Sequence, residues 1–129
     1  MRYTDEPISS VGALVERLRH HLNGVCAPAW FRGQSNSGWP LVPKLLRGDL
    51  SHSENYLIKR FRQNATLLLT QHPRNDFEWL FLMQHHSIPT RLLDWTESPL
   101  VALYFTLNEN EDEDKEGALW ILLPTILNE

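Results

Sequence analysis

Cysteine is almost absent from this chain, and its scarcity excludes several classes of protein. The single thiol, Cys26, cannot form an internal disulfide or supply a cysteine-rich zinc site. No segment approaches the roughly 18 consecutive apolar residues of a membrane span. Arg2, Asp5 and Glu6 stand where a signal peptide needs a basic start and an apolar middle. We therefore expect a soluble cytoplasmic protein that does not enter a membrane.

A basic excess is also missing. The 129 residues carry a formal charge of −4. Six acidic residues and one lysine lie between Glu109 and Glu116, a local charge of −5, so the rest of the chain carries +1. The acidic segment, residues 109–116, predicts a solvated loop. The nearly neutral remainder gives no support to tight nucleic-acid binding.

The nucleotide-binding and hydrolase signatures that depend on glycine are absent too. The chain has neither a P-loop nor a G-x-G-x-x-G fingerprint, and it has no G-x-S-x-G nucleophile elbow. His72, His85, His86 and Asp94 are potential metal ligands, but no two histidines have the i, i+4 spacing of a helical zinc pair. We expect no metal site.

The composition that remains, 42% hydrophobic and 22% charged, is typical of one globular domain spanning residues 1–129. Apolar spacing and capping residues predict four helices. The first covers about 10–23, and the second runs from Glu54 to Gln71 after a capping box of Ser51 and Glu54. The third begins after Asn75 or Asp76 and cannot continue through Pro89.

The fourth helix is predicted to begin at Pro99, after Thr96 or Ser98 as its cap. Its expected inward residues are Leu100, Leu103, Tyr104 and Leu107. Two strands are predicted: a short one over Ala29–Phe31, stopped by Gly33, and a closing one over Ala118–Leu123. Apolar residues on both faces of the closing strand are typical of a central position. The fold class is α+β, with a small and incomplete sheet.

Two polar segments stand out as candidate sites. In the first, residues 30–34, Arg32 follows a strand and offers a rigid fork for phosphate or carboxylate. Gly33 would let a ligand approach the backbone. The alternative is a structural arginine paired with a buried carboxylate, for which Asp94 is the obvious candidate.

The second segment, residues 84–96, packs two histidines, an arginine, an aspartate and two threonines around a proline. A polar group buried without a partner costs roughly 1–3 kcal/mol. These side chains must therefore bond to one another or face a cleft. His85 and Asp94 are the catalytic candidates, as a general base and its orienting group. Trp39 and Trp95 are core residues or stacking platforms for a flat ring.

With these segments in view, the chain resembles the FRG domain family, named for its Phe-Arg-Gly, over about residues 30–120. The residues that carry the resemblance are Phe31-Arg32-Gly33-Gln34, Trp39, Leu41, Pro43, Arg47, Glu78-Trp79-Leu80, Gln84-His85, Pro89 to Thr96, Ser98-Pro99-Leu100 and Ala102 to Phe105. One departure is Ser87, which stands where the family commonly has glycine. If that position needs a positive φ, Ser87 must strain or reshape the turn.

The FRG pattern is in turn similar to the opening motifs of ADP-ribosyltransferases. That resemblance implies an ADP-ribosyltransferase-like core in which Arg32 holds the phosphates of NAD and Thr90 or Thr96 lies beside the nicotinamide ribose. The full set of candidate ligand-binding residues is Arg32, Gly33, Gln34, His85, Thr90, Arg91, Asp94 and Thr96. The later catalytic glutamate of such enzymes has no evident counterpart, since Glu129 is the only acid after the closing strand.

Two hypotheses of different class follow. The first is a domain that binds NAD or a related nucleotide through Arg32 and the Thr90–Thr96 segment. The alternative is a noncatalytic interaction or sensor module of a prokaryotic or phage protein, in which the same polar residues form a structural network and the partner is a protein. A hydrolase that uses His85 and Asp94 would need a metal or an activated water that the sequence does not specify.

Overall fold

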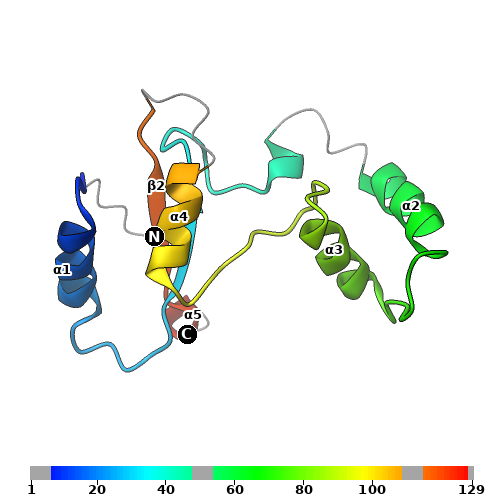
Figure 1. The fold of residues 1–129 in the computed structure, drawn as a ribbon. Coiled ribbons are helices and arrows are strands. Elements are labelled where there is room, and N and C mark those ends of the chain that lie inside the picture. The colour runs from blue at the N-terminus through cyan, green and yellow to red at the C-terminus, as the bar shows by residue number, and fades with distance from the viewer. Residues whose placement is uncertain (1–6, 48–53, 109–114, 128–129) are drawn as a thin grey trace. The chain divides into compact units, whose positions relative to one another are not determined.

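The computed structural model of the chain describes residues 7–47, 54–108 and 115–127. Its class is α+β, as predicted, and Figure 1 shows its elements in chain order. Two compact units can be distinguished, one formed by residues 1–29 with 123–129 and the other by residues 30–122. Across the described ranges, no helix combines the length and the apolarity needed to cross a membrane.

The first unit contains α1 (Val11–Leu22) and α5 (Pro124–Leu127). Ser10 caps α1, because its Oγ accepts a hydrogen bond from the backbone N–H of Ala13 at 3.1 Å. Leu14 and Leu18, one turn apart, are buried. The helix ends close to the predicted boundary, while α5 was not predicted.

The second unit contains a two-stranded antiparallel sheet of β1 (Trp30–Gln34) and β2 (Ala118–Leu122). Arg32 lies opposite Trp120 in the register, and Gly33 lies inside the strand. The prediction that Gly33 stops the strand was therefore wrong. The prediction of a central closing strand was also wrong within the described residues, where β2 pairs with β1 alone.

Helix α4 (Pro99–Asn108) packs on β1 and also contacts β2, as Figure 1 shows. Ala102 and Thr106, its two buried residues, face the sheet at Gly33. The predicted inward face was wrong, since the side chains of Leu100, Tyr104 and Leu107 are 55%, 58% and 64% exposed. The backbones approach so closely that only small side chains fit between them.

Helices α2 (Glu54–Ala65) and α3 (Asp76–His85) pack together in the same unit. The ring of Phe61 meets the edge of Trp79 at a centroid distance of 6.1 Å. Asn75 is the N-cap of α3, one of the two caps predicted, and accepts from the N–H of Glu78 at 3.0 Å. The other predicted cap, Asp76, is instead the first residue of α3.

Helix α2 ends earlier than the predicted Gln71. The hydroxyl of Thr66 donates to the carbonyl of Arg62 at 2.6 Å, a local bond that competes with regular helix geometry. A 3-10 turn, η1 (Lys44–Leu46), follows Pro43 and buries Leu45. Ser51, the predicted cap of α2, and residues 109–114 of the acidic segment lie outside the described residues.

Candidate functional site

Successive residues of β1 face opposite sides of the sheet, which separates the members of the Phe-Arg-Gly motif. A methyl group on Gly33 would lie 2.0 Å from the carbonyl oxygen of Ala102, so Gly33 faces α4. Phe31, two residues away on the same face, is 4% exposed. Arg32 lies on the other face. The close approach at Gly33 is therefore made by α4.

Arg32 is held by the polar segment that follows α3. Its Nη1 donates to the backbone carbonyl of Asp94 at 2.8 Å. The adjoining bridge between Phe31 and Thr96 fixes this segment beside β1, with hydrogen bonds of 2.7 and 2.9 Å. The hydrogen bond that joins Arg32 to Asp94 thus runs to the main-chain carbonyl.

The carboxylate of Asp94 belongs to a further set of hydrogen bonds. It accepts from Gln84 Nε2 at 2.6 Å, and Gln84 Oε1 accepts in turn from the hydroxyl of Thr90. Thr90, which is 2% exposed, also accepts from the N–H of Leu92 at 3.1 Å. We call Arg32, Gln84, Thr90 and Asp94 the motif network. It joins β1, the end of α3 and the following loop into one chain of hydrogen bonds.

Gln34 is fully engaged on the Arg32 face of the sheet. Its Oε1 accepts from Trp120 Nε1 at 2.5 Å, and its Nε2 donates to the carbonyl of Pro40 at 3.4 Å. The side chain is buried. Both ends of the amide therefore bond to other parts of the fold.

Arg91 forms a second connection, with the first residue of α2. Its guanidinium bonds both carboxylate oxygens of Glu54, with Nε at 2.7 and 2.9 Å from them. The side chain of Glu54 is 7% exposed and that of Arg91 is 63% exposed, so the arginine covers a buried carboxylate. Hydrogen bonding from Arg91 lowers the pKa of Glu54 below its ordinary value of 4.5, against the effect of burial, which raises it.

Thr96 and His85 occupy different environments. The hydroxyl of Thr96 accepts from the N–H of Ser98 at 3.1 Å in the turn before α4. His85 is exposed at the end of α3, with its ring 5.4 Å from that of His86. In the described chain the hydrogen bonds of Asp94 run to Arg32 and Gln84, and none joins it to His85. The structure therefore brings Arg32, Thr90 and Asp94 together and leaves His85 outside the motif network.

Ser87 adopts the positive φ that its position requires. Its φ is 58°, in the left-handed region that favours glycine. The N–H of Ile88 bonds the carbonyl of Met83 at 3.0 Å, and the N–H of Ser87 bonds that of Gln84 at 2.9 Å. This pair of bonds is the Schellman ending of a helix. Ser87 thus preserves the turn, although the left-handed conformation strains its backbone. The turn positions Gln84 to donate its hydrogen bond to the carboxylate of Asp94.

Two functional positions were missed from the sequence. Gln84 was noted only as part of a polar segment, although it connects Thr90 to Asp94. Glu54 was assigned to a capping box, and no local signal connects it to Arg91, which is 37 residues away.

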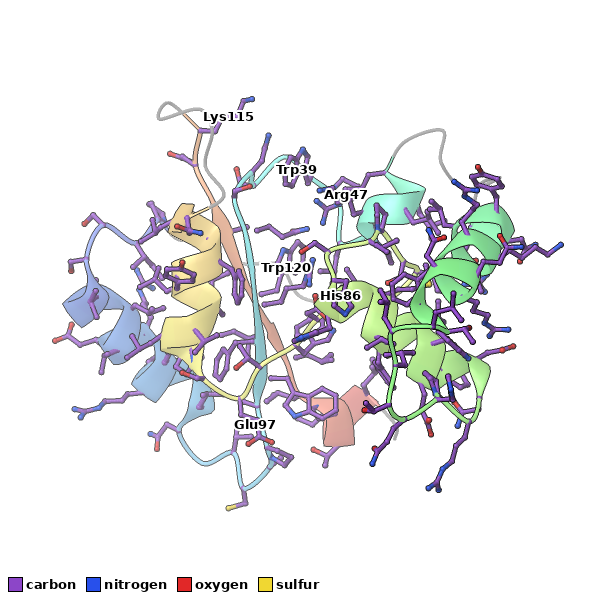
Figure 2. All side chains as sticks on the ribbon, turned by 45° about the vertical axis from the view of Figure 1, so that its right-hand side comes forward. Trp39, Arg47, His86, Glu97, Lys115 and Trp120 are labelled. Atoms are coloured by element: carbon purple, nitrogen blue, oxygen red, sulfur yellow. The ribbon has the colours of Figure 1, made fainter. Side chains whose placement is uncertain are left out.

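Trp39, a candidate stacking platform, carries the guanidinium of Arg47 over its ring at 4.7 Å (Figure 2). Groups of three potential metal ligands do not occur in the described parts of the chain.

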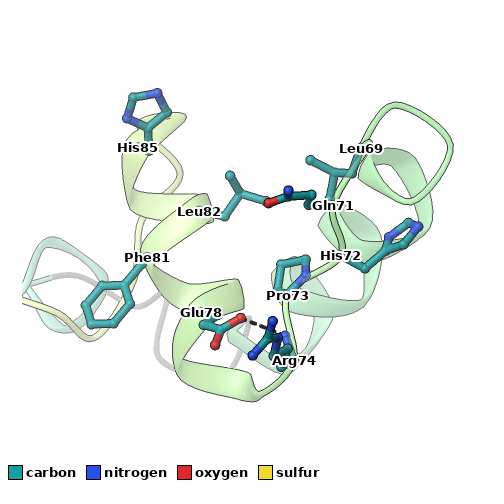
Figure 3. Close-up of a pocket in the computed structure, with 9 residues that line it drawn as sticks. All are labelled: Leu69, Gln71, His72, Pro73, Arg74, Glu78, Phe81, Leu82 and His85. Carbon is teal, nitrogen blue, oxygen red and sulfur yellow. Dashed lines mark hydrogen bonds between the residues drawn. The ribbon is translucent and has the colours of Figure 1, made fainter.

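Two hollows of the second unit lie on the α2–α3 hairpin, and none of the four motif network residues lines them. One has a volume of about 820 Å³, and Figure 3 shows the residues that line it: Leu69, Gln71, His72, Pro73, Arg74, Glu78, Phe81, Leu82 and His85. The other, of about 360 Å³, is lined by Phe61, Asn64, Ala65, Leu68, Leu69, Leu82 and His86. Among the candidate ligand-binding residues, His85 alone lines either hollow.

Comparison with known proteins identifies the family. A family model described as the FRG domain matches residues 27–115, a span that contains β1, the motif network and α4. No curated protein and no solved structure matches the chain. Because the matched span covers more than half of the sequence, the chain belongs to the FRG domain family.

Proposed function

We propose that this FRG domain is a noncatalytic binding module in which the motif residues hold the fold together. The observation that carries the proposal is their mutual bonding. Arg32 bonds the carbonyl of Asp94, Gln84 bonds Thr90 and the Asp94 carboxylate, and Arg91 bonds Glu54, while in the described chain Nε of Arg32 is buried without a hydrogen-bond partner. A ligand that used these groups would first have to break bonds that the protein already makes.

The positions of these bonds support a structural role. The loop after α3, residues 86–98, contains polar groups that bond to three other elements. It is connected to β1 through Arg32, to α3 through Gln84 and to α2 through Glu54. Two of these connections join elements far apart in the sequence: Arg32 and Asp94 are 62 residues apart, and Glu54 and Arg91 are 37 residues apart. Loss of one connection should therefore loosen the unit as a whole.

Thermal melting of Arg32→Ala tests the proposal. A hydrogen bond from a charged group contributes about 2 kcal/mol. For a chain of this length such a loss lowers Tm by about 8 °C. The matched control is Arg60→Ala, which removes an exposed arginine of α2 and should leave Tm unchanged. An Arg32→Ala variant that melts with the wild type would refute the structural role.

The second candidate is the ADP-ribosyltransferase-like reading, in which the domain binds NAD or a related nucleotide. One observation favours it: Thr96 bridges Phe31, the neighbour of Arg32 in β1, so two residues that the resemblance assigns to NAD lie on adjoining segments. Calorimetry with NAD and ADP-ribose decides this question. Binding by the wild type that Arg32→Ala loses, at a temperature where both are folded, would establish the site. No heat with either ligand would remove the idea, and nicotinamide release would be needed to show catalysis.

A further inference from the structure

We propose that the outer edge of β2 pairs with the same edge of a second copy of this chain, so that two small sheets join into one antiparallel sheet. The pairing surface is the backbone of Leu119 and Ile121. The proposal goes beyond the binding role proposed above, because it depends on the strand ladder and uses no side chain of the motif network.

The hydrogen bonds of β1 show which groups of β2 point outward. The N–H and the C=O of Phe31 both bond Thr96, at 2.7 and 2.9 Å, so neither bonds β2. Phe31 lies opposite Ile121. In an antiparallel ladder, a pair that exchanges no hydrogen bonds directs its backbone groups away from each other, and such pairs alternate with bonded ones. The next pair of this kind is Gly33 with Leu119, so Leu119 and Ile121 form the outer edge of β2.

This outer edge has no partner in the part of the chain that the structure describes. Among the described residues the sheet consists of β1 and β2 alone, and no backbone hydrogen bond from elsewhere reaches Leu119 or Ile121. Proteins usually protect such an edge with a charged residue, a proline or a bulge. The five residues of β2 include neither charge nor proline, and their register with β1 is continuous. The edge is therefore open to another strand.

The chemistry of β2 selects a second copy as the added strand. Its residues are apolar on both faces, so a strand that fits beside it must also be apolar on both faces. Of the two strands in the described chain, β1 carries Arg32 and Gln34, and only β2 meets this requirement. A two-fold axis at Trp120 places each residue of β2 opposite a residue of β2 in the other copy. Every position of the strand then faces an apolar residue, with no like charges opposed.

The same two-fold axis gives a partner to each outward backbone group. Leu119 of one copy lies opposite Ile121 of the other, and in this arrangement the two residues exchange both N–H···O=C bonds. The symmetry repeats the exchange on the other side of the axis. The two Trp120 residues form the pair between these exchanges. β2 then has a strand on each side, as strands that are apolar on both faces usually have.

Helix α4 adds apolar surface to this interface. The axis is perpendicular to the sheet, so both copies of α4 lie on one face of it. β1 and its symmetry mate are three strand spacings apart, about 14 Å, while a helix with its side chains is about 10–12 Å across. Because α4 contacts β2 as well as β1, it lies on the side of β1 toward the axis. Part of the exposed apolar surface of α4, which carries no charged residue, is therefore buried between the copies.

Hydrogen exchange at low and high protein concentration tests the pairing residue by residue. On the full chain, the amides of Trp120 and Leu122, which bond β1, should be protected at every concentration. Those of Leu119 and Ile121 should exchange rapidly when the protein is dilute and roughly tenfold more slowly when it is concentrated. Sedimentation equilibrium should show the mass rising from 15.1 kDa toward about twice that value over the same range.

Substitutions at Ile121 separate the outer edge from the rest of the strand. Ile121→Pro removes the outward N–H and none of the bonds to β1, and proline is accepted in an edge strand in that orientation. It should weaken dimerisation at least about tenfold. The control, Ile121→Val, keeps the N–H and a branched apolar side chain, so it should dimerise as the wild type does. If Ile121→Pro fails to fold, the exchange of the wild-type amides still decides the question.

Three results overturn the pairing: a wild type that stays monomeric, a folded Ile121→Pro that dimerises as the wild type does, and a dimer in which Leu119 and Ile121 exchange as fast as in the dilute protein. The last result would place the contact between copies on another surface. Each of these failures is distinct from failure of the proposed function, which depends on the melting of Arg32→Ala.

Discussion

Replacing Gly33 by alanine tests the contact on which the packing of α4 against β1 depends. The new methyl group would lie 2.0 Å from the carbonyl oxygen of Ala102, 2.5 Å from Thr106 Oγ1 and 2.8 Å from the nitrogen of Thr106. Two of these atoms are helix backbone and cannot turn aside. Gly33 does not have a positive φ, so alanine meets no conformational barrier of its own there. The whole cost of the substitution is therefore steric.

The size of the effect follows from these distances. Ordinary contact begins at 3.4 Å, so α4 would have to retreat by about 1.4 Å, which removes most of the dispersion energy of the contact. Such a shift also loosens Phe31 and Ala102, which are 4% and 0% exposed. Overpacking of a core usually costs about 1–3 kcal/mol. With three atoms too close, we expect about 3 kcal/mol and a Tm lowered by about 12 °C.

Thermal and urea denaturation of Gly33→Ala measure this loss. The control is Gly38→Ala, because a methyl group at Gly38 meets only the side-chain oxygen of Asn36, at 3.2 Å. That oxygen lies at the end of a movable side chain, so Gly38→Ala should cost less than about 1 kcal/mol. If Gly33→Ala melted at the same temperature as the wild type, α4 would not pack on β1 through this glycine.

Two further predictions concern the loop that carries the polar residues. Ser87→Gly should raise the free energy of unfolding by about 1 kcal/mol, because glycine adopts the φ of 58° without strain. The control, Ser87→Ala, should give no gain. Equal stability of the two variants in chemical denaturation would contradict the strained turn. Glu54→Gln should destabilise the protein at neutral pH. The pKa of Glu54 is lowered in the folded state, so its contribution is present above pH 4.5 and is lost as the pH falls through the folded pKa. Urea titrations should show the difference from wild type shrinking between about pH 5 and pH 3, and a difference independent of pH would refute the ion pair.

Local signals in the sequence were sufficient for the starts of helices. Pro99 begins α4, because a proline in the first turn has no N–H that needs a partner. Asn75 caps α3, because its side-chain oxygen accepts a hydrogen bond from a free N–H of the first turn. For Ser87 the sequence left two outcomes, strain or a reshaped turn, and the φ of 58° in an intact turn shows that strain is the one that occurs. The helix starts depend on a few neighbouring residues, which is why the sequence alone reveals them.

The buried face of α4 could not be predicted in the same way. Its residues are apolar nearly all round, so periodicity does not distinguish one side from another. Gly33 and Gly117 decide the matter by bringing the sheet close, and a methyl group at Gly117 would lie 2.2 Å from Thr106 Cγ2. Small residues therefore face the sheet and the large ones face outward. The partner of Arg91 was equally out of reach, because Glu54 belongs to another helix.

The order of residues in the Phe-Arg-Gly motif follows from the two faces of β1. Phe31 and Gly33 must share a face, since one is buried there and the other admits α4. Arg32 between them then points to the opposite face, where the carbonyl of Asp94 accepts its hydrogen bond. A shift of one residue in the pairing of β1 with β2 would exchange these faces and place the guanidinium against α4. The motif is therefore the minimum sequence for a strand that carries a closely packed helix on one side and a hydrogen-bonded loop on the other.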